Sequence, residues 1–310
     1  YQLHYSKKMS ETTNYNIAAH YTHGEGYYEQ EKLGEDLVDY GLENIILSSD
    51  TITSTNLIRR KWLNNDFAGL TFSLTHKMGN IDLILGGAGN RYSGQHYGNI
   101  IWTQYASNAN FNHLYYWNKA EKLDHNFYVK ANYKYSDATN LYADLQRRRI
   151  DYTFQGKDED GNTAQQEVAL TFFNPKFGLF HMLNENQAIY ASFAVANKEP
   201  NRNDYVESTP NSRPEHETLY DTEVGYKQSG EKLSLGINIY QMNYKNQLVL
   251  TGQINDVGAN TRTNIDKSFR RGVELEGSLS LGSNLKWSGN MTLSQNKITN
   301  YTAYIDNWNN

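Results

Sequence analysis

Cysteine is missing from this chain of 310 residues, and proline occurs only 4 times. The lack of cysteine excludes disulfide scaffolds and cysteine-ligated metal centres. No apolar run approaches the roughly 20 residues that a membrane-spanning helix needs. A surplus of positive charge is missing too, since the net charge is −5, so we do not expect the chain to bind nucleic acid.

Aromatic residues and glycine are plentiful, with 25 Tyr, 11 Phe, 5 Trp and 23 Gly. A disordered chain has few aromatic residues, and the charged fraction of 20% is ordinary for a folded protein. A polar, aromatic-rich, cysteine-free chain with this much glycine favours a large antiparallel β structure.

Apolar residues recur at every second position over segments of about ten residues. In 126–135, Phe127, Val129 and Ala131 alternate with polar residues, and the pattern returns in 233–240, 273–281 and 285–293. Successive side chains of a strand point to opposite faces. The alternation therefore predicts strands with one apolar and one polar face.

Turn signals and long irregular segments alternate along the chain. Short turn candidates include Met78–Asn80, Leu183–Asn186 and Gln228–Glu231. Long segments without a clean pattern separate the successive hairpins: His23–Leu57, Gly87–Leu123, Gln155–Val168, Asn197–His216 and Thr251–Asp266. Tight turns at one end and long loops at the other are typical of an outer-membrane β-barrel. We predict an all-β fold, an antiparallel transmembrane β-barrel with about twelve strands in this chain.

The barrel interpretation assigns each face of the alternating strands. We expect these residues to face lipid: Phe127, Val129, Leu233, Leu235, Ile237, Leu275, Leu279 and Trp287. We expect these to face the lumen: Lys130, Asn132, Asn238, Glu274, Glu276 and Asn290. A soluble β-sandwich is the competing interpretation, but its strands average about five or six residues and it needs no one-sided set of long loops.

Three stretches resemble the barrel of TonB-dependent outer-membrane receptors. Tyr190–Ala194 runs into Asn197–Arg202 as a strand entering a loop at a proline. Arg213–Glu215 with Asp221–Lys227 is similar to the start of a hairpin in the family, and Asn264–Lys267 with Arg270–Glu276 is similar to a later strand. The high Tyr and Asn content is similar to that of receptors of the Bacteroidetes type.

The resemblance implies a wider protein and a transport function. The family's barrel has about 22 strands around a plugged lumen, so we interpret 1–310 as a partial barrel that lacks the plug domain, the TonB-box segment and the last strands. Such a partial barrel has two open edges, and we expect residues near Tyr1–Ser6 and Tyr301–Trp308 to be its edge strands. By resemblance, the complete protein is a receptor in the bacterial outer membrane. The inner-membrane TonB complex energises it to import a scarce ligand such as ferric siderophore, haem or cobalamin. Two alternatives stay open: a passive outer-membrane channel without a plug, and a soluble carbohydrate-binding β domain.

Candidate site residues fall into three groups. An aromatic stretch treated as a loop supplies the candidates for small-molecule or metal-chelate binding: Tyr97, Trp102, Tyr105, His113, Tyr115, Tyr116 and Trp117. Glu274 and Glu276 are lumen-facing wall residues, with contact to the plug as the alternative. Four arginines are placed at the extracellular rim, where they suit lipopolysaccharide phosphates or an anionic ligand: Arg147, Arg149, Arg270 and Arg271.

Neither a metal site nor an enzyme is expected. The 9 histidines are scattered, and no pair has the i,i+4 spacing of a metalloenzyme helix. No glycine-rich phosphate loop, nucleophile elbow or supported triad occurs in the sequence. We therefore predict neither a cofactor nor a catalytic residue.

Overall fold

A computed structural model describes residues 1–159, 161, 165–206, 208, 213–254, 260–282, 284–303 and 305. The strands are β1 (Gln2–Lys8), β2 (Thr13–Asp36), β3 (Ile45–Ile46), β4 (Thr51–Ile52), β5 (Ser54–Met78), β6 (Ile81–Thr103), β7 (His113–Lys134), β8 (Thr139–Lys157), β9 (Gln166–Asn184), β10 (Gln187–Lys198), β11 (Glu217–Ser229), β12 (Leu233–Ile254), β13 (Asn260–Ser280) and β14 (Lys286–Ile298). A 3₁₀ helix (Leu37–Tyr40) and one short helix, α1 (Arg202–Val206), complete the secondary structure.

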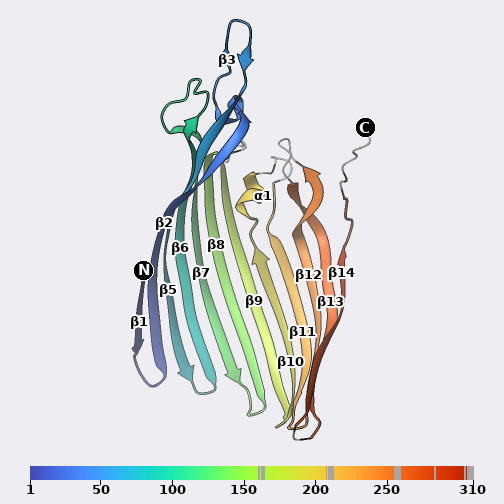
Figure 1. Cartoon of the computed structure of the whole chain (residues 1–310). Helices are drawn as coiled ribbons and strands as arrows, with labels where there is room; N and C mark the ends of the chain where they lie inside the picture. Colours follow the sequence, from blue (N-terminus) through green and yellow to red (C-terminus); the bar gives the residue numbers. More distant parts are fainter. Residues whose placement is uncertain are drawn as a thin grey trace.

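Twelve strands form one antiparallel sheet in which every strand pairs with its neighbours along the chain. The sheet curves like the wall of a wide barrel, with β1 and β14 at its two edges (Figure 1). β3 and β4 form a separate small hairpin above the β2–β5 pair. The twelve-stranded antiparallel architecture confirms the predicted fold class.

Short turns join the strands at one end of the sheet, where the sequence predicts them. Gly79 and Asn80 connect β5 to β6, and Gly79 has φ +55°, a conformation that glycine adopts without steric cost. Glu185 and Asn186 connect β9 to β10 in the same way. These connections lie at the bottom of the molecule in Figure 1.

The strands extend much further than the sequence predicts, and most of the expected long loops are wrong. β2 and β5 run through much of His23–Leu57, and β6 and β7 leave only 104–112 between them. A strand crosses the apolar band in roughly ten residues, whereas β5 has 25. Above the membrane both faces of a strand meet water, so these parts of the strands lose the alternation that would have identified them.

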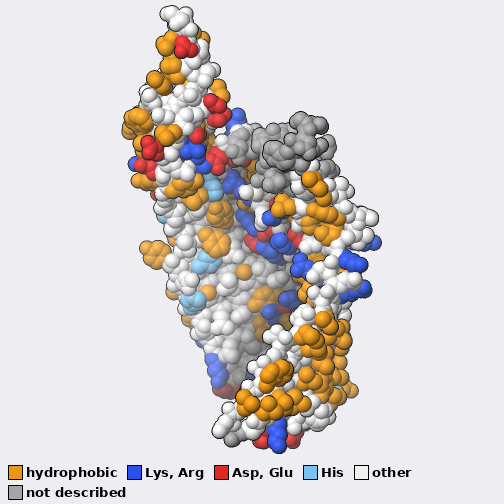
Figure 2. Space-filling view, turned by 45° about the vertical axis from the view of Figure 1, so that its right-hand side comes forward, with side chains coloured by type: hydrophobic (Ala, Val, Ile, Leu, Met, Phe, Trp, Pro, Cys, Tyr) orange, Lys and Arg blue, Asp and Glu red, His pale blue; other side chains and the backbone are white. Residues whose placement is uncertain are grey.

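The register places each expected set of side chains on its predicted face. Lys130 of β7 stands opposite Asp144 of β8, and the same row continues through the sheet to Arg270 on β13. Glu274 and Glu276 share the face of Arg270, while Leu275 and Leu279 lie on the other. Figure 2 looks into the hollow of the sheet, where charged side chains gather. The polar face is therefore the inner face and the apolar face the outer one.

Tyrosine rings cover glycines on the inner wall. A Cβ atom on Gly225 would lie 2.1 Å from Cζ of Tyr190, and one on Gly272 would lie 2.7 Å from the hydroxyl of Tyr240. The missing side chains leave room for the rings to lie against the backbone. In this way the rings pack closely against neighbouring strands between β10 and β13.

Ile237 of β12 provides a test of the outer face. It lies four residues into the strand, about 10 Å above its lower end and nearer the middle of the apolar band than Leu235. Ile237→Arg should lower barrel stability by about 2–4 kcal/mol because it exposes a charge to lipid. The measurement is reversible urea unfolding of the complete protein in lipid vesicles.

Thr292→Arg is the matched control for this test. Thr292 pairs with Glu274 on the inner face at a similar height, so a new arginine there meets water and a carboxylate. An equal loss of stability in both variants would contradict the face assignment.

The expected edge strand at Tyr301–Trp308 is wrong for the part that the structure describes. β14 ends at Ile298, and residues 301–303 are not in a strand. The Tyr301 hydroxyl instead donates to the carbonyl of Leu250 (2.9 Å). Trp308 lies outside the described residues. At the other end, Tyr1–Ser6 was also expected at an edge, and β1 occupies it.

Neither of the two helices within the described ranges is long and apolar enough to cross a bilayer.

Candidate ligand-binding site

The segment 199–206, which follows β10 and contains α1, folds onto the inner face of the sheet (Figure 1). Tyr205 is only 2% exposed and packs in a cluster with Ala120, Phe154 and Val168 from β7, β8 and β9. Gln166 donates a side-chain hydrogen bond to the carbonyl of Tyr205 (2.7 Å). We call 199–206 the inward segment, since it covers the inner wall instead of projecting outward.

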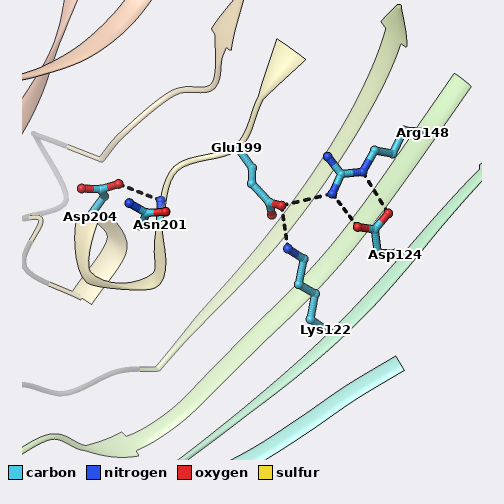
Figure 3. Close-up of polar contacts among 6 residues, drawn as sticks. All are labelled: Lys122, Asp124, Arg148, Glu199, Asn201 and Asp204. Carbon is cyan, nitrogen blue, oxygen red and sulfur yellow. Dashed lines mark hydrogen bonds and ion pairs between the residues drawn. The ribbon is translucent and has the colours of Figure 1, made fainter. Parts of the chain in front are cut away.

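An ion-pair network holds the start of the inward segment (Figure 3). The Glu199 carboxylate lies 2.6 Å from Nζ of Lys122 and 3.2 Å from Nη2 of Arg148. Arg148 also makes a two-pronged contact with Asp124, at 2.9 Å from Nε and 2.5 Å from Nη2. These side chains are 20–26% exposed. Partial burial makes the pairs stronger than exposed ones and gives the cluster a fixed geometry.

Arg202 is the second anchor of the inward segment. Its guanidinium donates to Oδ1 of the buried Asn118 on β7 (2.5 Å). Asp204 caps the turn by accepting from the backbone N–H of Asn201 (2.7 Å) and lies 3.6 Å from Arg262 of β13 (Figure 3 shows the Asn201 contact).

Aromatic side chains surround these cations on the inner wall. Nζ of Lys122 lies 5.6 Å from the centre of the Tyr152 ring, and Tyr92 stands opposite Lys122 on β6. Burial lowers the pKa of His96, and the charge of Arg202 lowers it further. His96 therefore adds no second positive charge beside Arg202 at pH 7.

The lumenal cluster, which we define as Lys122, Asp124, Arg148, Glu199 and Arg202, has three cations and two carboxylates. Its formal charge is +1, in a chain whose net charge is −5. Positive charge, ring faces and amide groups below the extracellular end of a lumen suit an anionic ligand with planar groups.

The aromatic candidates lie mostly in strands, which corrects their assignment to a loop. Tyr97 and Trp102 belong to β6, and His113, Tyr115, Tyr116 and Trp117 belong to β7. Tyr105 alone lies in the connection. The reason is the extension of both strands beyond the apolar band.

The structure divides these candidates between the two faces. The rings of Tyr115 and Tyr116 both lie against Gly98 on the inner face. A β-bulge interrupts the register between β6 and β7 at this point. Tyr115 packs against Tyr40, and the ring of His113 lies 3.0 Å from the carbonyl of Tyr40. Tyr97 and Trp117 stand opposite each other on the outer face. The candidates therefore do not form one site.

The four arginine candidates also separate. Arg147 and Arg149 of β8 and Arg271 of β13 lie on the outer face, but Arg270 lies on the inner one, with its guanidinium 5.4 Å from the Tyr244 ring. Its inner-face position points Arg270 away from membrane phosphates, and the alternative of an anionic ligand in the lumen stays a prediction for this residue. Arg149 is paired with Asp151 (2.6 Å), whereas Arg147 contacts none of the described carboxylates.

Glu274 and Glu276 line the inner wall far below the lumenal cluster. Asn238 donates to Glu274 (3.4 Å) and to Glu223 (3.3 Å), and it accepts from Tyr190 (3.0 Å). Glu274 thus belongs to a hydrogen-bond network of the wall. Among the described residues no group of three or more His, Asp or Glu is arranged to hold a metal ion.

Sequence reasoning missed most of the lumenal cluster. Arg148 lies between the two predicted candidates, Arg147 and Arg149. Strand alternation alone places Arg148 on the opposite face from both. The polar positions of 126–135 are the even-numbered ones, and the same alternation places Lys122 and Asp124 on that polar face. Nothing in the sequence indicated that the inward segment would reach β7 and β8.

Glu199 allows the anchoring of the inward segment to be tested. Glu199→Gln removes the charge that attracts both Lys122 and Arg148, so amides 199–206 should exchange with solvent about tenfold faster, equivalent to about 1.4 kcal/mol. Hydrogen–deuterium exchange of the complete protein measures this. Glu121→Gln is the control, since Glu121 pairs with Lys119 on the outer face. Equal exchange in both variants would remove the anchoring role.

An antiparallel sheet with an apolar outer face, a polar hollow and tight turns at one end is the wall of an outer-membrane β-barrel. All 310 residues match the family model described as TonB dependent receptor-like, beta-barrel, and the chain belongs to this family. Its place is the bacterial outer membrane. Family membership rules out a soluble carbohydrate-binding domain, and the matched family is one of receptors and not of enzymes.

Solved structures of low sequence identity share the fold. The copper transporter OprC has a TM-score of 0.72 at 14% identity, over 96% of this chain and 46% of that one. The unliganded ferric citrate transporter FecA has 0.65 at 12%, over 97% and 43%. The ferric yersiniabactin uptake receptor FyuA from Yersinia pestis has 0.58 at 13%, over 96% and 42%. The chain thus spans less than half the length of these structures. No curated protein matches the sequence.

Proposed function

We propose that the complete protein is a TonB-energised receptor that imports a scarce anionic ligand, with a ferric chelate as the favoured class. The observation that supports this is the lumenal cluster, where Lys122, Arg148 and Arg202 lie beside aromatic side chains below the extracellular end of the barrel. Guanidinium and ammonium groups donate to carboxylate, catecholate or phosphate oxygens, and the rings stack on planar groups.

The inward segment positions this site. Its anchors come from strands that lie 51 to 84 residues away in the sequence, so the segment fixes β7 and β8 relative to the top of β10. A ligand that reached the cluster would displace or contact Glu199 and Arg202 first. We propose that a plug domain fills the lumen below. Movement of the inward segment would then change its contacts with the plug domain when the ligand binds.

The partners follow from the same proposal. The TonB complex would act through a plug domain and TonB box, and outer-leaflet lipid would contact the apolar outer face. Arg147, Arg149 and Arg271 lie on that face, and Arg147 near the upper limit of the apolar band suits a lipopolysaccharide phosphate.

Uptake of labelled ferric chelates by cells that produce the complete protein tests the function. We expect uptake that stops when a protonophore removes the proton-motive force. A passive channel, the alternative without a plug, would continue to admit small solutes under the protonophore. Uptake that ignores the proton-motive force would therefore overturn the receptor proposal.

A further inference from the structure

Four aromatic residues form a row across the outer face of four adjacent strands. Tyr27 of β2 stands opposite Trp62 of β5, Trp62 opposite Tyr97 of β6, and Tyr97 opposite Trp117 of β7. The ring centres of Tyr27 and Trp62 are 4.5 Å apart. Those of Trp62 and Tyr97 are 5.8 Å apart, with the planes within 6° of parallel. We call these four residues the aromatic row.

The aromatic row lies too far from the membrane to be an interfacial girdle. On β5 the outward apolar residues begin at Ala68, and Trp62 is six residues further out. At this tilt the distance along the membrane normal is about 15 Å. The headgroup region extends only about 5–8 Å beyond the hydrocarbon on each side. The row therefore projects into the layer of sugars above the outer-leaflet lipid.

Polar side chains border the row on both sides. On the membrane side, Glu25, Asn64, Gln95 and Lys119 stand opposite one another, one per strand. Within the described ranges, Glu25, Asn64 and Gln95 make no side-chain hydrogen bond, so their donors and acceptors are available to a ligand. On the far side, Arg60 lies 4.5 Å from the Tyr27 ring centre and pairs with Glu29 (2.9 Å).

We propose that the aromatic row binds the core oligosaccharide of lipopolysaccharide in the same membrane. Neighbouring strands are about 4.8 Å apart, so the rings repeat at roughly the length of one sugar residue along a direction across the strands. Apolar C–H faces of sugars would lie on the rings, and their hydroxyl groups would bond to Glu25, Asn64 and Gln95.

The position of the aromatic row favours lipopolysaccharide as its partner over a free glycan or a protein. The row belongs to the outer face and lies above the lipid-facing surface of the same strands, whereas imported ligands enter through the lumen. Mixed carboxylate, amide and cationic groups beside flat rings suit many hydroxyl groups better than a purely apolar partner. The proposal needs only the outer-membrane location and does not depend on the imported ligand.

Hydroxyl-radical footprinting of the complete protein in nanodiscs tests the proposal residue by residue. One set of nanodiscs contains lipopolysaccharide with a full core and the other contains lipid A alone. We expect oxidation of Trp62, Tyr97 and Trp117 to be several-fold slower with the full core, while Phe111, which is 89% exposed in the β6–β7 connection, stays unchanged. Equal oxidation in both nanodiscs overturns the proposal.

The double variant Trp62→Ala with Tyr97→Ala provides the second arm. The double variant removes two of the four stacking faces, so binding of delipidated core oligosaccharide should weaken by about tenfold, measured by ligand-observed NMR. Phe111→Ala should leave that binding unchanged. Undiminished binding by the double variant, or protection caused by a bound protein in place of the oligosaccharide, would overturn the assignment.

Discussion

Arg202→Gln should weaken binding of an anionic ferric chelate by about tenfold to a hundredfold. The substitution removes one of the three cations of the lumenal cluster, and a hydrogen bond to a charged group contributes about 1.5–3 kcal/mol. The formal charge of the cluster falls from +1 to 0. Fluorescence titration of the purified complete protein measures the affinity, and uptake at low ligand concentration should fall with it.

Arg91→Gln is the matched control. Arg91 lies on the outer face of β6, is 63% exposed in its side chain and is 3.6 Å from Glu121, so the same loss of charge occurs outside the lumen. We expect its binding of the chelate to equal that of the unchanged protein. A neutral ligand such as cobalamin should bind both variants alike. Equal weakening by both substitutions would mean that only the overall charge matters.

The membrane-spanning part of the fold was predictable because lipid imposes a strict period of two. Val129 and Lys130, or Leu275 and Glu276, can only sit on opposite faces, and one face must be apolar along the height of the bilayer. The strand number and the lumenal position of Glu274 and Glu276 follow from that rule, whereas the tight turns follow from turn residues such as Gly79 and Asn80.

The extracellular ends of the strands were not predictable by the same rule. Above the apolar band, one face of each strand meets water and the other a polar lumen, so outward residues such as Asn64, Gln95 and Lys119 are polar as well. The alternation that marks a strand disappears there although the hydrogen-bonded ladder continues. Tyr97 and Trp117 were therefore assigned to a loop, when they stand opposite each other on paired strands.

The lumenal cluster depends on contacts that no local pattern encodes. Glu199 meets Lys122 and Arg148 across 77 and 51 residues of chain. These contacts exist because the inward segment turns towards the hollow instead of away from it. Only the side of the strand on which Arg148 lies could be read from the sequence, and the choice of its partner came from the tertiary fold.

The 310 residues expressed alone should fail to form a closed, protease-resistant barrel. β14 pairs with β13 on one side only, and β1 pairs only with β2, so each edge presents a row of unpaired N–H and C=O groups. Each such group costs several kcal/mol in hydrocarbon, where water cannot satisfy it. The sum far exceeds the stability of an ordinary fold.

Direct closure of β1 onto β14 is a poor remedy. β1 has 7 residues and β14 has 13, so part of β14 would stay unpaired even in the best register. A twelve-stranded barrel also requires tighter curvature and a different shear from the wide sheet seen here. We therefore expect the chain to aggregate or to pair its edges with another copy.

Heat-modifiable migration on gels and resistance to protease decide between these outcomes, with the complete protein produced in the same cells as the control. The complete protein should migrate as a folded barrel until it is boiled, and the 310-residue chain should not. A monomeric, closed and protease-resistant barrel from these residues alone would contradict the prediction. That result would also favour the passive channel, because twelve strands would then suffice to line a pore without the rest of a receptor.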